Sequence, residues 1–152
     1  MANINLPRVL LGGVAAGLII ICGELVLNGV VLADQWAEFR ERHLIDTPGT
    51  AQYAVGGVLT LSYGIVLTWI YAAMLPRFGP GRGTAIIAGL TFWVIAYALF
   101  LLSVWANGAA PLYVAVVSIL WGLVEAPVAA LAGAWLYRER EGPAAGRAPL
   151  HA

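Results

Sequence analysis

Residues 112–137 read LYVAVVSILWGLVEAPVAALAGAWLY and contain one charged side chain, that of Glu125. A helix needs about 20 apolar residues to cross the hydrocarbon core of a bilayer, which is about 30 Å thick. Three further runs of this kind occupy residues 9–32, 50–75 and 84–105. Because a backbone in lipid must satisfy its own hydrogen bonds, each run is predicted to form a membrane-spanning helix.

The composition supports a membrane protein. Of the 152 residues, 61% are hydrophobic and 11% are charged, whereas a soluble domain averages about 45–50% and about 25%. Eight arginines balance eight acidic residues, so no nucleic-acid partner is expected. The single cysteine, Cys22, excludes an internal disulfide and a cysteine-based metal site. We therefore predict an all-α integral membrane protein, a four-helix transmembrane bundle, with one domain over residues 1–141.

The regions between the runs contain turn-forming residues, at 46–49, 76–83 and 107–111. Residues 33–45, ADQWAEFRERHLI, place apolar side chains at helical spacing among charged ones. They predict a short amphipathic helix in the first outer loop, which either lies on the membrane surface or extends the first span into solvent. Residues 142–152 are small and polar, and are predicted to be a disordered cytoplasmic tail.

The arginines predict the orientation of the chain. In a four-span protein two of them, Arg40 and Arg42, lie on one side of the membrane. The other six lie on the opposite side: Arg8, Arg77, Arg82, Arg138, Arg140 and Arg147. The positive-inside rule then predicts that both termini are cytoplasmic.

Two carboxyl groups fall inside the predicted spans, those of Glu24 and Glu125. An ionised acid at the centre of a bilayer costs about 2.5–3.5 kcal/mol on insertion scales, so both are expected to face the bundle interior. We expect Glu24, Asn28 and Glu125 to form one buried polar cluster, with Thr60 or Tyr63 as a hydrogen-bond donor. No basic residue lies in any span, so at least one acid is expected to carry a proton. This cluster is either polar contact between helices or a proton or ligand site.

Helix contacts are predicted where small residues recur on one face of a span. At 100° per residue, five of them share the faces of the two acids: Gly13, Gly17, Gly122, Ala129 and Gly133. Pro127 lacks a backbone N–H and is predicted to kink the fourth span. The third span is mainly aromatic and is predicted to be a packing surface, with Phe92, Trp93, Tyr97 and Phe100.

The sequence predicts no catalytic residue, metal site or cofactor. His43 and His151 both lie outside the spans, which excludes a haem held by histidines between helices. The motifs of zinc hydrolases, serine hydrolases and P-loop proteins are absent from the sequence. Residues 79–84, GPGRGT, lack the P-loop spacing and are predicted to be a connector.

Three stretches carry a resemblance to known proteins: 12–28, 69–85 (WIYAAMLPRFGPGRGTA) and 121–139 (WGLVEAPVAALAGAWLYRE). Here the chain resembles a group of small uncharacterised bacterial four-span inner-membrane proteins. The resemblance implies the four-span fold and a multi-pass location in a bacterial inner (cytoplasmic) membrane, and it implies no activity. The small multidrug transporters share the number of spans and a glutamate in the first helix, which is a likeness of topology alone.

Three classes of function fit these residues. The first, which the sequence favours, is an accessory or self-associating membrane subunit, in contact with the lipid bilayer and with either a second copy or a larger membrane complex. The second is a small proton-coupled carrier that uses Glu24 and Glu125. The third is a membrane enzyme for a lipid or quinone-like substrate, with a carboxyl group as acid or base, and the lack of a nucleophile or metal set argues against it.

Overall fold

The structure is a computed structural model that describes residues 4–137. Within them the chain is helical, with connecting loops and no strand. The elements are α1 (Leu6–Val26), the π-helix η1 (Leu27–Val31), α2 (Ala33–His43), α3 (Thr50–Phe78), α4 (Arg82–Trp93), the π-helix η2 (Val94–Leu99), α5 (Phe100–Ala106) and α6 (Leu112–Leu136).

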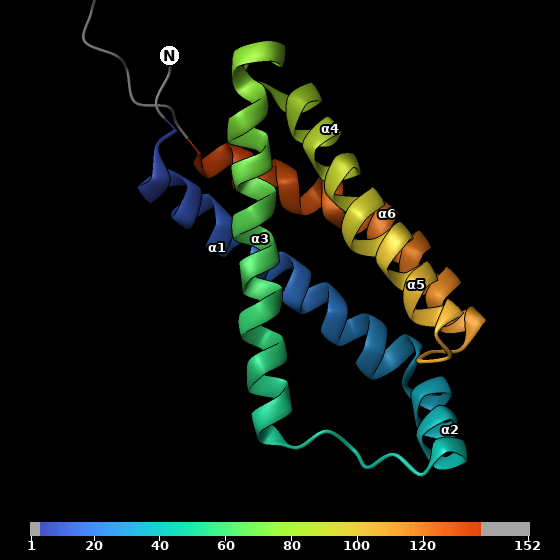
Figure 1. The fold of residues 1–152 in the computed structure, drawn as a ribbon. Coiled ribbons are helices and arrows are strands. Elements are labelled where there is room, and N and C mark those ends of the chain that lie inside the picture. Colours follow the sequence, from blue (N-terminus) through green and yellow to red (C-terminus); the bar gives the residue numbers. More distant parts are fainter. Residues whose placement is uncertain (1–3, 138–152) are drawn as a thin grey trace, which may run out of the picture.

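Four long apolar segments of this structure are long enough to cross a membrane, and they pack as a bundle (Figure 1). They are Leu6–Val31, Thr50–Phe78, Arg82–Ala106 and Leu112–Leu136. This result confirms the predicted all-helical four-span fold. The short amphipathic helix is present as α2, and its contact with a membrane surface stays a prediction.

The start of α1 and the end of α6 lie at the same end of the bundle. There the backbone N–H of Asn5 donates a hydrogen bond to the Tyr137 hydroxyl at 3.3 Å. The Tyr137 ring also packs edge-on against Tyr71 of α3, with ring centroids 6.0 Å apart. The predicted tail at 142–152 and three of the arginines lie outside the described residues, so the location of the termini stays a prediction.

The helix of the second span extends three residues beyond the predicted run 50–75. The helix α3 continues through Pro76 and ends at Phe78, and the backbone N–H of Gly79 still bonds to the Leu75 carbonyl at 2.8 Å. A proline in the last turn removes only one hydrogen bond, so it need not end the helix there. The chain turns instead at Gly79 and Gly81, where φ is 72° and 147°.

Glycines set the crossing of α1 and α3. A Cβ atom at Gly13 would lie 2.5 Å from Ile65 Cα, and one at Gly17 would lie 2.9 Å from Leu61 Cα. From the other side, a Cβ atom at Gly64 would collide with the backbone of Gly13 and Gly17. The two helices therefore approach as closely as their backbones permit, which is how small residues join helices in membranes.

Small residues also seat α6 against its neighbours. A Cβ atom at Gly133 would lie 2.5 Å from Thr68 Oγ1 and 3.3 Å from the Gly12 carbonyl oxygen. Ala129 is fully buried in the core. On the side of α4, a Cβ atom at Gly89 would lie 2.6 Å from Pro127 Cα. The helix α6 is continuous through Pro127, and the kink stays a prediction.

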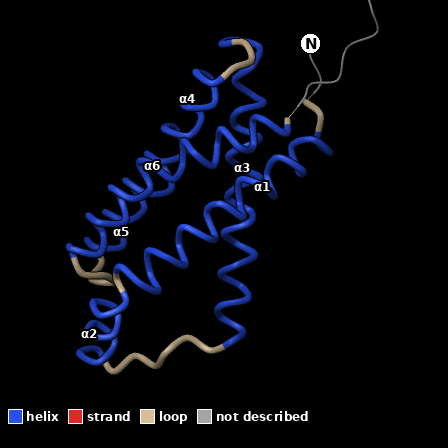
Figure 2. Tube along the Cα trace, turned by 180° about the vertical axis from the view of Figure 1, so that it is seen from behind, coloured by secondary structure: helices blue, strands red, loops and turns tan. Residues whose placement is uncertain are grey.

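The half of α3 that begins at Thr50 stands apart from the other spans in both views (Figures 1 and 2). Residues 50–59 are exposed, except for the partly buried Gly57. A Cβ atom at Gly56 or Gly57 would meet nothing within 4 Å. The bundle is thus tight where α1 crosses α3 and open toward the end that carries α2.

Candidate functional site

Six side chains from five elements form one connected hydrogen-bond network. In order they are Trp36, Asn28, Glu24, Tyr97, Glu125 and Trp121. They come from α2, η1, α1, η2 and α6, and the last two share α6. The structure therefore brings Glu24, Asn28 and Glu125 together, as the sequence predicts, but it joins them through aromatic side chains.

Glu24 lies between Asn28 and Tyr97. Its Oε2 atom accepts a hydrogen bond from Asn28 Nδ2 at 2.7 Å, and its Oε1 atom lies 3.2 Å from the Tyr97 hydroxyl oxygen. The Asn28 amide oxygen accepts a hydrogen bond from Trp36 Nε1 at 2.9 Å. Asn28 follows Glu24 by one helical turn, and this spacing brings the two side chains into contact.

Glu125 lies on the other side of Tyr97. Its Oε2 atom is 2.5 Å from the Tyr97 hydroxyl oxygen, and its Oε1 atom accepts a hydrogen bond from Trp121 Nε1 at 3.3 Å. Glu125 is buried, with 8% of its surface exposed. Two small residues make room for this arrangement, because a Cβ atom at Gly23 would collide with Glu125 Oε1 and one at Gly122 would collide with the Tyr97 ring.

The number of protons on the two carboxyl groups follows from the hydrogen bonds that Tyr97 makes to them. One oxygen of each carboxyl group already accepts a hydrogen bond from another side chain: Glu24 Oε2 from Asn28, and Glu125 Oε1 from Trp121. The other two carboxyl oxygens, Glu24 Oε1 and Glu125 Oε2, each face the Tyr97 hydroxyl oxygen across a gap. Each of these two gaps is a hydrogen bond only if one proton lies between the two oxygens. A tyrosine hydroxyl supplies one proton, so the pair of carboxyl groups supplies the second. The fully bonded cluster therefore carries one carboxyl proton and one net negative charge.

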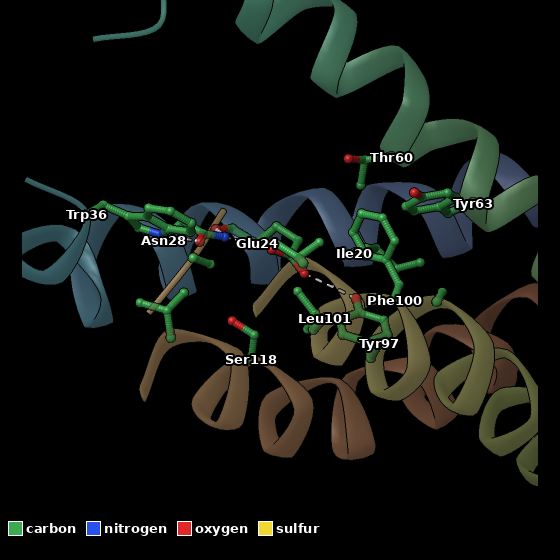
Figure 3. Close-up of a pocket in the computed structure, with 14 residues that line it drawn as sticks. Ile20, Glu24, Asn28, Trp36, Thr60, Tyr63, Tyr97, Phe100, Leu101 and Ser118 are labelled. Atoms are coloured by element: carbon green, nitrogen blue, oxygen red, sulfur yellow. Dashed lines mark hydrogen bonds between the residues drawn. The ribbon is translucent and has the colours of Figure 1, made fainter. Parts of the chain in front are cut away.

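A cavity of about 460 Å³ lies beside Glu24. Its lining residues come from all four spans and from α2, and those with polar or aromatic side chains are Glu24, Asn28, Trp36, Thr60, Tyr63, Tyr97, Phe100 and Ser118. None of the described residues that line it is arginine or histidine. Figure 3 shows Glu24 and Tyr97 joined by a hydrogen bond at the cavity, with Thr60 and Tyr63 on α3 across from them.

A second hollow, of about 580 Å³, lies beside Glu125. Its walls are mainly apolar, and its lining residues are Ile19, Gly23, Val117, Leu120, Trp121, Val124, Glu125 and Val128. No residue lines both this hollow and the cavity beside Glu24. The two acids therefore open onto different spaces, and Tyr97 connects them.

The hydrogen bonds to the two acids in the structure come from other residues than the predicted Thr60 and Tyr63. Thr60 and Tyr63 line the cavity, but the hydroxyl that contacts both carboxyl groups belongs to Tyr97. Tyr63 instead packs edge-on against Phe92, with ring centroids 5.8 Å apart. Tyr97 was predicted to be a packing residue, and Gly23, Trp36 and Trp121 were not predicted at the site.

One signal could have found Trp36 and Trp121. Each has an indole N–H that needs a partner in an apolar setting, and Trp121 precedes Glu125 by one helical turn. Tyr97 is harder to place, because it lies in the π-helix η2. The wider turn of a π-helix changes the direction of side chains relative to a regular helix, so a wheel at 100° per residue misplaces it.

The described residues contain no group of three or more His, Cys, Asp or Glu side chains that could hold a metal ion. The chain matches no protein-family model, no curated protein and no solved structure. The arguments for function therefore come from the site itself.

Proposed function

We propose that this protein is a small proton-coupled carrier that binds an organic cation in the cavity beside Glu24. The observation that carries the proposal is Glu24 at the wall of that cavity, joined through the Tyr97 hydroxyl to the second carboxyl group, that of Glu125. The cluster carries one net negative charge when every hydrogen bond is made, and no basic side chain of the described residues lines the cavity. A bound cation neutralises that charge.

The shape and lining of the cavity support a cation with an apolar body. Its volume of about 460 Å³ falls within the range of about 300–1,000 Å³ that is typical of small-molecule sites. Aromatic rings of Trp36, Tyr63 and Phe100 line it, and rings of this kind attract cations through their faces. A small aromatic or alkyl ammonium ion matches both the charge and the apolar walls.

Proton coupling follows from charge inside the membrane. An unneutralised carboxylate in the bilayer interior costs several kcal/mol. A second proton or a cation at Glu24 therefore removes the same charge, and each excludes the other. A site at which a proton and a cation compete in this way can exchange them across the membrane.

The binding step is tested by calorimetry on the purified protein in detergent. Benzyltrimethylammonium has one aromatic ring and one quaternary nitrogen, and neopentylbenzene is its neutral analogue with carbon in place of nitrogen. The proposal predicts binding of the cation, little binding of the neutral analogue, and at least about tenfold weaker cation binding in Glu24→Gln. Equal binding of the two compounds, or wild-type affinity in Glu24→Gln, contradicts it.

A second candidate, a self-associating or accessory subunit, is favoured by the outer half of α3. Residues 50–59 are exposed apart from Gly57, and a Cβ atom at Gly56 or Gly57 would meet nothing within 4 Å. Native mass spectrometry of the protein, gently extracted from its own membrane, tests this candidate. A stoichiometric second polypeptide supports an accessory subunit, a homodimer supports self-association, and a lone chain argues against both.

We further propose that the protein lies in the inner membrane of a bacterium with both termini in the cytoplasm. Arg8, Arg77 and Arg82 lie at one end of the bundle, and Arg40 and Arg42 belong to α2 at the other. Labelling of single cysteines in a Cys22→Ser background tests the orientation. Glu41→Cys is expected to react with a membrane-impermeant reagent in intact cells, and Arg77→Cys is expected to be protected.

A further inference from the structure

We propose that the two acids divide the work: a cation binds at Glu24, and the proton that the cluster retains moves through the Tyr97 hydroxyl to Glu125. This inference rests on the proposed function and assigns different roles to the two carboxyl groups of the same site. Glu24 is then the ligand-binding carboxylate, and Glu125 is the proton acceptor.

The contacts of Tyr97 supply the path. Its oxygen lies 3.2 Å from Glu24 Oε1 and 2.5 Å from Glu125 Oε2. With one carboxyl proton in the cluster, each of these two gaps holds one proton, and two arrangements are possible. Either Glu24 donates to Tyr97 and Tyr97 donates to Glu125, or the direction of both hydrogen bonds is reversed.

The step that joins the two arrangements is balanced. The Glu24 O–H bond breaks as its proton bonds to the Tyr97 oxygen, and the Tyr97 O–H bond breaks as that proton bonds to Glu125 Oε2. The tyrosine is unchanged afterwards, Glu24 is a carboxylate and Glu125 is a carboxylic acid. A cation beside Glu24 favours this arrangement because it places the negative charge next to the cation.

The surroundings of the two acids explain why the roles are not interchangeable. Glu24 lines the cavity with aromatic walls, whereas Glu125 lines the mainly apolar hollow beside Gly23 and Trp121. A neutral carboxylic acid suits that apolar hollow, while a carboxylate paired with a cation suits the cavity. The two spaces share no lining residue, so the proton and the cation occupy different places.

No other charged side chain of the described residues competes for the proton. The titratable groups that line the cavity are Glu24, Tyr63 and Tyr97, and the only one that lines the hollow is Glu125. The salt bridge between Arg42 and Glu38 is exposed on α2 and lies outside both sets. When the cation binds, the proton of the cluster therefore moves only among Glu24, Tyr97 and Glu125.

The first part of the test compares two conservative variants. A glutamine at position 125 imitates a neutral carboxylic acid, so Glu125→Gln is expected to keep benzyltrimethylammonium affinity within about threefold of wild type or better. Glu24→Gln is expected to lose at least about tenfold. An equal loss in both variants overturns the division of roles, because it means that each carboxyl group serves the cation directly.

The second part follows the proton by infrared difference spectroscopy on adding benzyltrimethylammonium. Wild type is expected to lose the carboxylic-acid band of Glu24 and to gain that of Glu125. The gained band is expected to be absent in Glu125→Gln and in Tyr97→Phe, while Tyr113→Phe, at an exposed residue outside both spaces, keeps it. Cation binding without this gain overturns the inference and leaves the proposed function standing. No cation binding by wild type overturns both, so the two failures are distinct.

Discussion

Gly23 and Glu125 face each other across the contact between α1 and α6, and a single methyl group at position 23 would occupy the place of the Glu125 carboxylate oxygen. Gly23 directly precedes Glu24. The first span therefore makes room for the Glu125 side chain at one residue and supplies the second acid, Glu24, at the next. The absence of a side chain at position 23 allows both acids to reach Tyr97.

Replacing Gly23 by alanine is expected to displace the Glu125 side chain and break its contact with Tyr97. Because the clash involves the end of a flexible side chain, the fold is expected to survive with a small loss of stability. The cation-induced carboxylic-acid signal is expected to disappear. Gly29→Ala is the matched control, since a Cβ atom there meets nothing within 4 Å, and an unchanged signal in Gly23→Ala contradicts the prediction.

Replacing Gly64 by alanine is expected to separate α1 from α3. The added Cβ atom meets the backbone of Gly13 and Gly17, which cannot rotate away, and overpacking of this kind costs about 1–3 kcal/mol. Thermal unfolding in detergent is expected to occur several degrees lower than in wild type. Gly57→Ala, on the same helix with nothing near its Cβ atom, is expected to unfold at the wild-type temperature or above, and equal melting of the two variants contradicts the packing.

Replacing Trp36 by phenylalanine is expected to loosen α2 from the first span. The substitution keeps an aromatic ring in the cavity wall but removes the hydrogen bond to the Asn28 amide oxygen, which is worth about 0.5–1.5 kcal/mol. Faster hydrogen exchange across Ala33–His43 is the expected readout. Trp135→Phe serves as the control, because Trp135 is 80% exposed, and equal exchange in both variants counts against this role of Trp36.

Cation affinity is expected to rise with pH. A second proton and the cation neutralise the same negative charge, so removing protons from solution favours the cation, by at most about tenfold per pH unit for one competing proton. The rise ends once the second proton is no longer bound. Calorimetric titrations at several pH values check this expectation, and an affinity that falls with pH is the contrary result.

The fold was predictable because each span carries its own signal. A run such as 84–105 has no charged residue, and a helix of that length is long enough to cross the hydrocarbon core of a bilayer. No contact with another span is needed to identify it. The ends were less predictable. Pro76 lies inside the last turn of α3, where local geometry, not the presence of a proline, decides whether the helix continues.

The candidate site was predictable in part. Glu24, Asn28 and Glu125 are polar residues in apolar runs. Because burying each of them without a polar partner is costly, they are expected to contact one another. The residue that joins them could not be found in this way, because Tyr97 resembles the other aromatic residues of its span. Its position depends on the π-helix Val94–Leu99 and on the space left by Gly122, which are properties of the assembled bundle.

The central claim is that a proton and an organic cation exchange at the carboxyl pair, and transport by the purified protein in liposomes tests it most directly. Vesicles with an acidic interior are diluted into alkaline buffer that contains labelled benzyltrimethylammonium, with the membrane potential clamped. The account predicts that wild type accumulates the cation, that collapsing the pH difference releases it, and that Glu24→Gln matches protein-free vesicles. Equal uptake by wild type and Glu24→Gln, or uptake that ignores the pH difference, contradicts the account.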